Sequence, residues 1–264
     1  MTESATEQPR SGVVARDDLV AYLLRLGDDA LITAQRLGEW SARAPEMEED
    51  IALSNIALDQ LGAARLFLTY AGEVEGEGRD EDALAYLRQD FEFRNAQLVE
   101  LSDTDFGTAI AKLLCLSAFQ HPLYEALSAS TDPRIAGIAA KAVKESAYHL
   151  DHATMWAVRL GDGTPESHRR MADALDEVWP YTFELFESDA VTRRVAAAGV
   201  GVDPSALRDG WADTIGDVLR RATLDVPTTD WRPTGGRDGR HTESLGYLLA
   251  EMQVLHRAHP GANW

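Results

Sequence analysis

The sequence has 264 residues, of which 44 are acidic and 25 are basic, so its formal net charge is −19. A surface of this charge repels polyanions, which disfavours nucleic acids and anionic membranes as partners. The charged fraction of 26% and the hydrophobic fraction of 45% are those of an ordinary folded chain, and they exclude an acidic disordered protein.

Cysteine usage and apolar runs bear on the cellular compartment. The single cysteine, Cys115, can form neither an intrachain disulfide nor a thiolate zinc site, which fits a reducing, cytoplasmic setting. No uninterrupted apolar run approaches the roughly 18 to 20 residues that a membrane span needs, and residues 1–18 are polar rather than signal-like. We therefore expect a cytoplasmic protein that is neither secreted by that route nor embedded in a membrane.

The local signals along the chain are almost entirely those of helices. Three steps place a capping oxygen directly before a proline, which suits the first turn of a helix. They are Asp132-Pro133, Thr164-Pro165 and Asp203-Pro204. Apolar residues recur at helical spacing, and the alternation typical of strands is hardly visible. We predict an all-α fold with helices at 17–43, 46–73, 80–99, 105–130, 133–160, 165–188, 204–223 and 242–257.

Breaks and loops divide these predicted helices. Pro180 lies inside the apolar pattern of segment 165–188, so this helix is predicted to kink or to break there. The glycine-rich segment 74–82 is a predicted loop, and segment 226–240 is a long irregular one of a length that usually has a function. Residues 1–16 are expected to form a disordered tail and residues 17–264 a single helical domain.

Long helices in antiparallel array are typical of the ferritin-like bundle, here with extra C-terminal helices. Its di-iron sites need a Glu from each of two helices and a Glu-x-x-His from each of two others. None of the seven histidines follows a glutamate by three positions. Two remnants remain: Asp59 in an otherwise apolar helix, and His149, which follows Ser146 instead of a glutamate. We interpret Asp59 and His149 as vestigial positions that pair with each other, or with Asn55 or Arg65.

Two alternatives include a metal ion. In the first, the chain is an autonomous di-iron or manganese oxidase with the irregular ligands Asp59, Glu145, His149 and His152. In the second, the His-x-x-His pairs His149/His152 and His256/His259 bind a divalent ion, although neither has a third ligand in register. Hydrolase and phosphate-loop signatures such as Gly-x-Ser-x-Gly and Gly-Lys-Ser/Thr are absent.

Two short basic patches are conspicuous on so acidic a chain. Patch 92–95 combines an aromatic ring, a guanidinium and an amide, and patch 193–195 follows the segment that Pro180 interrupts. Arginine binds phosphate in a bidentate fork and an aromatic ring stacks on a base, so these patches can hold a phosphorylated handle such as coenzyme A. The predicted substrate-binding residues are Glu92, Phe93, Arg94, Asn95, Arg193, Arg194 and Val195. In the alternative, the arginines lie on the surface and pair with nearby acids, namely Asp90, Glu92 and Asp189.

A set of short motifs extends over residues 18–264. The N-terminal ones are Leu26-Gly27-Asp28, Leu37-Gly38-Glu39-Trp40, Ala44-Pro45-Glu46, Asn55-Ile56-Ala57-Leu58-Asp59 and Ala142-Val143-Lys144-Glu145 with Tyr148-His149. The C-terminal ones are Asp203-Pro204, Gly235-Gly236 to Gly239, His241-Thr242-Glu243, Leu245-Gly246, Leu249-Ala250-Glu251-Met252-Gln253 and Pro260-Gly261 to Trp264. In this combination the sequence resembles the C subunits of the multicomponent phenylacetyl-CoA epoxidase, also called the ring-1,2 phenylacetyl-CoA oxygenase.

This resemblance implies a function that composition and spacing do not give. It implies a structural, non-catalytic ferritin-like subunit in aerobic phenylacetate catabolism, with no catalytic residues, no metal and no cofactor of its own. The implied partners are a homologous catalytic A subunit and further complex subunits including a reductase. The A subunit would carry the di-iron centre and epoxidise the aromatic ring of phenylacetyl-CoA with O₂, and phenylacetyl-CoA would lie near the interface. By the same resemblance, the catalytic paralogue would have Glu-x-x-His where this chain has Asp59 to Gly62, and again where it has Ser146 to His149.

Overall fold

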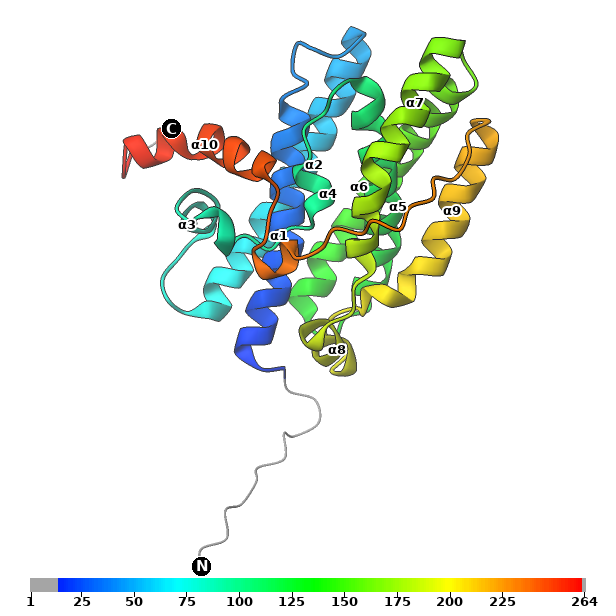
Figure 1. Ribbon diagram of the computed structural model, residues 1–264. Coiled ribbons are helices and arrows are strands. Elements are labelled where there is room, and N and C mark those ends of the chain that lie inside the picture. The colour runs from blue at the N-terminus through cyan, green and yellow to red at the C-terminus, as the bar shows by residue number, and fades with distance from the viewer. Residues whose placement is uncertain (1–13, 263–264) are drawn as a thin grey trace, which may run out of the picture.

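The computed structural model describes residues 14–262, so most of the expected tail 1–16 and the C-terminal Trp264 lie outside the described residues. Between these limits all regular elements are helices and none is a strand, which confirms the all-α prediction. Four long helices form an up-and-down bundle (Figure 1). They are α1 (Arg16–Gly38), α2 (Met47–Glu75), α5 (Phe106–Leu127) and α6 (Pro133–Gly161).

Close packing of α1 on α2 sets one half of the bundle. Gly27 makes this approach possible, because a Cβ at that position would lie 2.8 Å from the side chain of Leu68. Phe67, Leu23 and Leu114 are fully buried between the helices and belong to the main hydrophobic core. The core therefore follows the axis of the bundle.

The predicted helix signals after the bundle are mostly confirmed. Thr164 caps α7 (Pro165–Val178) by accepting from Ser167 N, and the chain then tightens into a 3-10 segment, Trp179–Phe186, as Pro180 predicts. A further 3-10 turn, Pro204–Leu207, begins at the Asp203 cap and leads into α9 (Arg208–Arg221). The short helix α8 (Ala190–Ala197), which begins at the cap residue Asp189, was not predicted from the sequence.

The predicted helix 80–99 is wrong. The structure has α3 (Glu81–Tyr86), a 3-10 turn Asp90–Glu92, and α4 (Gln97–Glu100). Two carboxylates of α1 explain the break, because Asp28 accepts from Arg94 N and Asp29 accepts from Ala96 N, both at 2.8 Å. Backbone N–H groups bound to α1 cannot also bond to carbonyls one turn back, so the helix is interrupted. The first helix also ends at Gly38 instead of residue 43.

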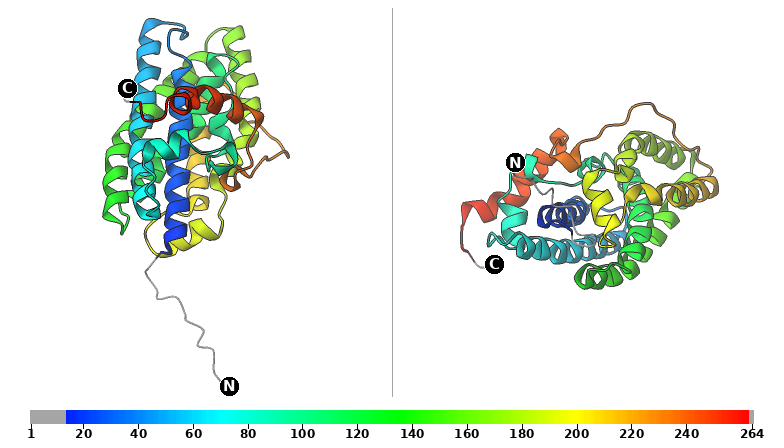
Figure 2. Two further views of the ribbon diagram at one scale, coloured as in Figure 1. Left: turned by 90° about the vertical axis from the view of Figure 1, so that its left-hand side faces the viewer. Right: turned by 90° about the horizontal axis from the view of Figure 1, so that it is seen from below.

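The C-terminal segment crosses the front of the bundle and ends in an outlying helix. Segment 226–240 is irregular as predicted, apart from the 3-10 turn Gly236–Asp238. Helix α10 (Glu243–Ala258) then projects to one side, next to α3 (Figure 1). Seen from below, α2 and α6 form the back of the bundle, opposite segment 226–240 (Figure 2).

Helix α2 is more apolar than expected from the sequence. By length and composition alone it qualifies as a candidate membrane-crossing helix, although Asp59 and Arg65 interrupt it, so it is not an uninterrupted apolar run. Core helices of bundles meet the same requirements, and the inner face of α2 is such a core face, with Leu53 and Ile56 almost completely buried. Five large apolar side chains lie exposed on its outer side: Met47, Ile51, Leu58, Leu61 and Leu66.

Candidate functional site

The vestigial positions Asp59 and His149 lie opposite each other between α2 and α6. His149 Nε2 is 3.1 Å from Asp59 Oδ2, so the predicted pairing of these two residues is confirmed, in preference to pairing with Asn55 or Arg65. The ring of His149 is 2% exposed, and its burial lowers the pKa although the neighbouring Asp59 carboxylate acts in the opposite direction.

The proposed irregular metal ligands do not converge on one point. His152 Nε2 lies 2.8 Å from the Glu49 carboxylate, and Glu145 forms an ion pair with Lys141 at 3.2 Å. Within residues 14–262 no three His, Cys, Asp or Glu side chains stand close enough together to hold a metal ion. Because di-iron sites need about six such ligands in one cluster, the donors present here do not fit that centre.

An amide pair fills the interior beside these ion pairs. Gln60 of α2 donates to the Gln120 side chain of α5 at 2.7 Å, and Gln120 donates back at 3.3 Å. Both side chains are 3% exposed. Nearby, Ser146 shares a hydrogen bond of 3.3 Å with His121 Nδ1. The bundle interior at this level is therefore closed by neutral groups that bond to one another.

Patch 92–95 is mostly internal. Phe93 is fully buried, with the Arg88 guanidinium 4.1 Å from the centre of its ring, and Asn95 is buried and donates to Glu100 at 2.9 Å. Arg94 is half-buried and donates to the backbone oxygens of Phe91 and Phe93 rather than to Asp90 or Glu92. Burial lowers the pKa of Arg94. The ring of Phe93 is thus not available to stack on a base in this structure.

Patch 193–195 is more accessible. Arg193 is exposed and donates to the Ser188 carbonyl at 3.1 Å. Arg194 forms a two-bond ion pair with Asp18 of α1, with both bonds at 2.6 Å, although the sequence suggested Asp189 as its partner. Val195 is fully buried and anchors α8.

Helix α1 also fixes the separation of the two patches. Arg94 is tied to Asp28 through its backbone and Arg194 is tied to Asp18, ten residues earlier. Ten helical residues correspond to about 15 Å along the axis. The two ties are therefore about 15 Å apart along α1, and the assignment of the patches to substrate binding stays a prediction.

A buried polar latch under segment 226–240 was not predicted from the sequence. Glu184, which is 2% exposed, accepts from Gln97 N at 2.7 Å, from Gly235 N at 2.9 Å and from Gly236 N at 2.6 Å. Burial raises its pKa, and the positive charge of Arg237 partly opposes the shift. The adjacent glycines were the only signal for this latch, because a side chain at Gly236 would collide with the Asn95 carbonyl.

A second buried contact holds the start of α10. His241 is bonded through Nδ1 to the Glu100 carboxylate at 2.8 Å, and its Nε2 donates to the Phe93 carbonyl at 3.1 Å. Burial by itself lowers the pKa of His241, but the bond to Glu100 and its negative charge raise it above the ordinary value. Segment 235–243 is therefore attached to α4 through the hydrogen bond between His241 and Glu100.

Half of the exposed large hydrophobic side chains lie on α2 and α6, the two helices at the back of the bundle. Of the 14 such side chains among residues 14–262, five lie on α2, two on α6 and three on α10. We call the α2 and α6 members the back face: Met47, Ile51, Leu58, Leu61, Leu66, Tyr148 and Met155. A helix that is apolar on all sides is normally buried on all sides, so the outer side of α2 is typical of a surface that a partner covers.

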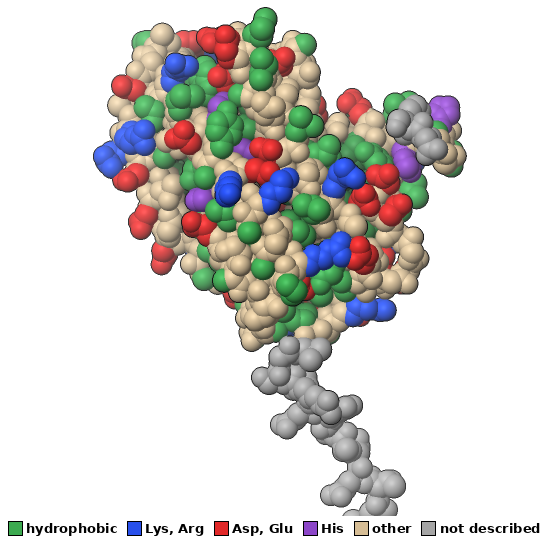
Figure 3. Space-filling view, turned by 180° about the vertical axis from the view of Figure 1, so that it is seen from behind, with side chains coloured by type: hydrophobic (Ala, Val, Ile, Leu, Met, Phe, Trp, Pro, Cys, Tyr) green, Lys and Arg blue, Asp and Glu red, His purple; other side chains and the backbone are tan. Residues whose placement is uncertain are grey.

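A groove adjoins the back face where α10 leaves the bundle. It has a volume of about 340 Å³ and lies between α1, α2, α3 and α10. Its lining is mostly apolar and includes Leu31, Leu58, Leu61, Tyr86 and Met252. From behind, a notch is visible between the main body and the C-terminal arm, with apolar side chains around it (Figure 3). The groove can take side chains from a helix laid across α2.

Known proteins are similar to this chain over nearly its whole length. The family described as "Phenylacetic acid catabolic protein" matches residues 1–264. The chain is 46% identical over 248 residues to a protein of Escherichia coli (strain K12) that is named as the C subunit of 1,2-phenylacetyl-CoA epoxidase. The matched region covers 94% of this chain and 100% of that protein.

Proposed function

The chain belongs to the phenylacetic acid catabolic protein family, and on this premise we propose that it is the structural, non-catalytic subunit of a phenylacetyl-CoA epoxidase. In this proposal a homologous A subunit holds the di-iron centre and oxygenates the ring, and further subunits including a reductase supply electrons. The E. coli relative is named as one subunit of such an enzyme, which supports a multi-subunit setting.

The closed bundle centre is the observation that carries the non-catalytic assignment. Where a di-iron protein would bring carboxylates and histidines together, this chain has the reciprocal Gln60 and Gln120 amide bond and the separate Asp59 and His149 pair. A neutral amide pair cannot supply the negative charge that two iron ions require. The oxidase with irregular ligands lacks a comparable supporting observation, because His152 pairs with Glu49.

The back face supports the assembly part of the proposal. Obligate interfaces typically bury more than about 2,000 Å² and have apolar centres, and the back face offers exposed side chains such as Met47 (76%), Leu58 (64%) and Ile51 (56%). We propose that the homologous subunit lays its own helices across α2 and α6, with side chains entering the groove beside α10.

A contribution to the coenzyme A pocket is a finer proposal. Arg193 and Arg194 remain the better candidates, because their guanidinium groups are accessible while Phe93 and Asn95 are buried. Replacing Arg193 by Ala in the assembled enzyme is expected to raise the KM for phenylacetyl-CoA about tenfold, with kcat nearly unchanged, since a contact to the handle acts equally on ground and transition states. An unchanged KM in an intact complex would contradict it, and a lost complex would assign Arg193 to the interface.

The main test is reconstitution with the homologous subunit, followed by metal analysis and turnover of each fraction. We expect iron and activity only with the partner, and loss of co-purification when Leu58 is replaced by Glu. Val226 provides the matched control, because it is 51% exposed but lies outside α2 and α6, so Val226→Glu should assemble normally. Near two irons per isolated chain, with turnover of phenylacetyl-CoA, would overturn the structural role. Equal assembly of both variants would overturn the back-face interface.

A further inference from the structure

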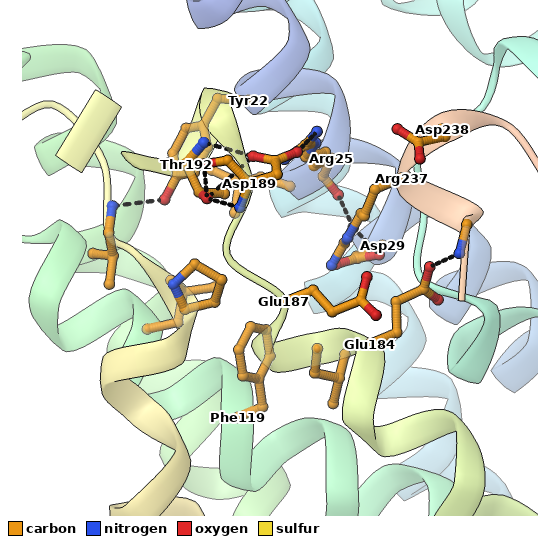
Figure 4. Close-up of a pocket in the computed structure, with 16 residues that line it drawn as sticks. Tyr22, Arg25, Asp29, Phe119, Glu184, Glu187, Asp189, Thr192, Arg237 and Asp238 are labelled. Atoms are coloured by element: carbon orange, nitrogen blue, oxygen red, sulfur yellow. Dashed lines mark hydrogen bonds and ion pairs between the residues drawn. The ribbon is translucent and has the colours of Figure 1, made fainter. Parts of the chain in front are cut away.

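Two places in the molecule differ in what their residues do for the chain itself. The pocket between α1, α5 and α8 has a volume of about 110 Å³, and its arginines pair within the chain, Arg25 with Asp189 and Arg237 with Asp29 (Figure 4). These ion pairs attach later segments of the chain to α1. Gly62, on the outer side of α2, has no comparable role within the described residues.

Gly62 lies near the middle of the 29-residue helix α2. A glycine inside a helix is destabilising relative to alanine, because more backbone freedom is lost on folding. Two other glycines of the bundle are required by their neighbours. A Cβ at Gly27 would lie 2.8 Å from the side chain of Leu68, and one at Gly72 would collide with the Arg79 carbonyl oxygen.

Among residues 14–262 no neighbour requires a glycine at position 62. A Cβ there would have one atom within 4 Å, the Nζ of Lys141 at 3.6 Å, which is an ordinary contact with the flexible end of a side chain. The backbone of Gly62 is regularly helical, so alanine would fit without strain. The missing side chain therefore leaves space on the outside of the molecule.

Exposed leucines flank this space on the same side of α2. Leu58 and Leu66 lie four residues before and after Gly62, and positions four apart share one face of a helix. Leu58 is 64% exposed and Leu66 is 41% exposed, so the three residues form an apolar ridge with a gap at its centre. Helices pack ridge into groove at about 8–10 Å between axes, depending on the side chains at the contact, so the gap permits a close approach.

The charged side chains next to the gap restrict what can fill it. Three of them already have partners within the chain: Asp59 lies 3.1 Å from His149, Arg65 lies 3.4 Å from Glu81, and Lys141 lies 3.2 Å from Glu145. A charged group that entered the gap would lose hydration without gaining a free counter-charge from these residues. The gap therefore favours an apolar side chain, surrounded by a polar rim as in other interfaces.

We propose that a helix of the homologous subunit crosses α2 at Gly62 and seats an apolar side chain between Leu58 and Leu66. This inference rests on the proposed function, in which the homologous subunit covers the back face. It goes further by naming the point of closest approach, the kind of side chain that fills it, and a residue that is needed only in the complex.

The test compares Gly62→Ala with Gly216→Ala in the full chain. Gly216 of α9 is equally open, but Ala212 and Arg220 lie one turn away on either side, so no apolar ridge surrounds it. Both variants should raise the urea midpoint of the isolated chain, because alanine is the better helix former. Only Gly62→Ala should weaken binding to the purified homologous subunit, by about tenfold in calorimetric titration, because the added methyl group overpacks the crossing point. Gly62→Leu should weaken it by about a hundredfold or more.

Equal affinities of the Gly62→Ala and Gly216→Ala chains would overturn the crossing point. If Leu58→Glu still prevents assembly in that case, the back-face interface stands and only this inference fails; if it does not, the interface fails as well. A lower urea midpoint for Gly62→Ala than for wild type would also contradict the inference, because the glycine would then be needed within the chain. Binding that weakens strongly as NaCl is raised would overturn the choice of an apolar side chain.

Discussion

Gly236 is one of the positions at which a single added methyl group should destabilise the fold. A Cβ built there would lie 2.3 Å from the Asn95 carbonyl oxygen, a separation that real Cβ atoms essentially never show. To increase this distance to even 3.0 Å, the loop that contains Gly236 must move away from Asn95 by about 0.7 Å. Such a shift would stretch the bond from Gly236 N to Glu184, now 2.6 Å, to roughly 3.3 Å, beyond the normal range.

The expected loss of stability follows from these two effects. Forcing extra atoms into a close-packed site costs about 1–3 kcal/mol, and weakening a hydrogen bond to a charged acceptor costs up to about 1.5–3 kcal/mol. Because the loop can relax in part, we expect Gly236→Ala to lower the free energy of unfolding by about 3 kcal/mol. The loop would also hold α10 less firmly, because Gln97 bonds to the Arg240 carbonyl at the same place.

Urea denaturation followed by tryptophan fluorescence measures this effect through the midpoint and the slope. Gly216→Ala in α9 is the matched control, since a Cβ there meets no atom within 4 Å. This second variant should be more stable than wild type by about 0.5–1 kcal/mol, because alanine restricts the unfolded chain and favours a helix. Gly236→Ala within 1 kcal/mol of wild type, or equal losses in both variants, would refute the reasoning.

Three further outcomes are expected. Phe93→Ala should lower the free energy of unfolding by about 3–5 kcal/mol, because the ring is fully buried. Phe91→Ala should change it by less than about 0.5 kcal/mol, because Phe91 is 62% exposed; equal losses in the two variants would contradict the burial of Phe93. Gln120→Leu should lower the free energy of unfolding by about 1–3 kcal/mol, because it leaves the buried Gln60 amide without a hydrogen-bond partner. The double variant Gln60→Leu with Gln120→Leu should recover part of that loss, and strictly additive effects would contradict the interaction of the two amides. The pKa of His241 is raised in the folded chain, so the contribution of its protonated form to stability is fully present below the unfolded pKa of about 6.5 and is lost as pH rises through the folded pKa. His241→Gln should therefore reduce the decrease in unfolding free energy over this pH range, as measured by denaturation curves at a series of pH values. An unchanged pH profile would contradict this role of His241.

Local signals in the sequence were sufficient for the long helices. The caps at Asp132, Thr164 and Asp203 and the break at Pro180 depend on a few neighbouring residues, so the spacing alone located them. The pairing of Asp59 with His149 was also predictable, because a charge in an apolar helix needs a partner on a facing helix.

Contacts between distant segments explain what the sequence could not give. Segment 80–99 has a helical composition, but Asp28 and Asp29, more than 60 residues earlier, take its backbone N–H groups. The same folding turns Phe93 inward under Arg88, so an apparent aromatic and basic binding patch is largely core. No local pattern reports which acids of another helix will face a segment.

The apolar outer side of α2 also bears on how such a chain must be made in a cell. Met47, Ile51 and Leu58 are exposed while the chain is alone, and chaperones and proteases continuously sort proteins that present such surfaces. If a partner covers the back face as proposed, a chain synthesised in excess of that partner would be removed or would aggregate, so the level of this subunit would follow that of the partner. The supply of the partner, rather than the intrinsic stability of the fold, would then set its abundance.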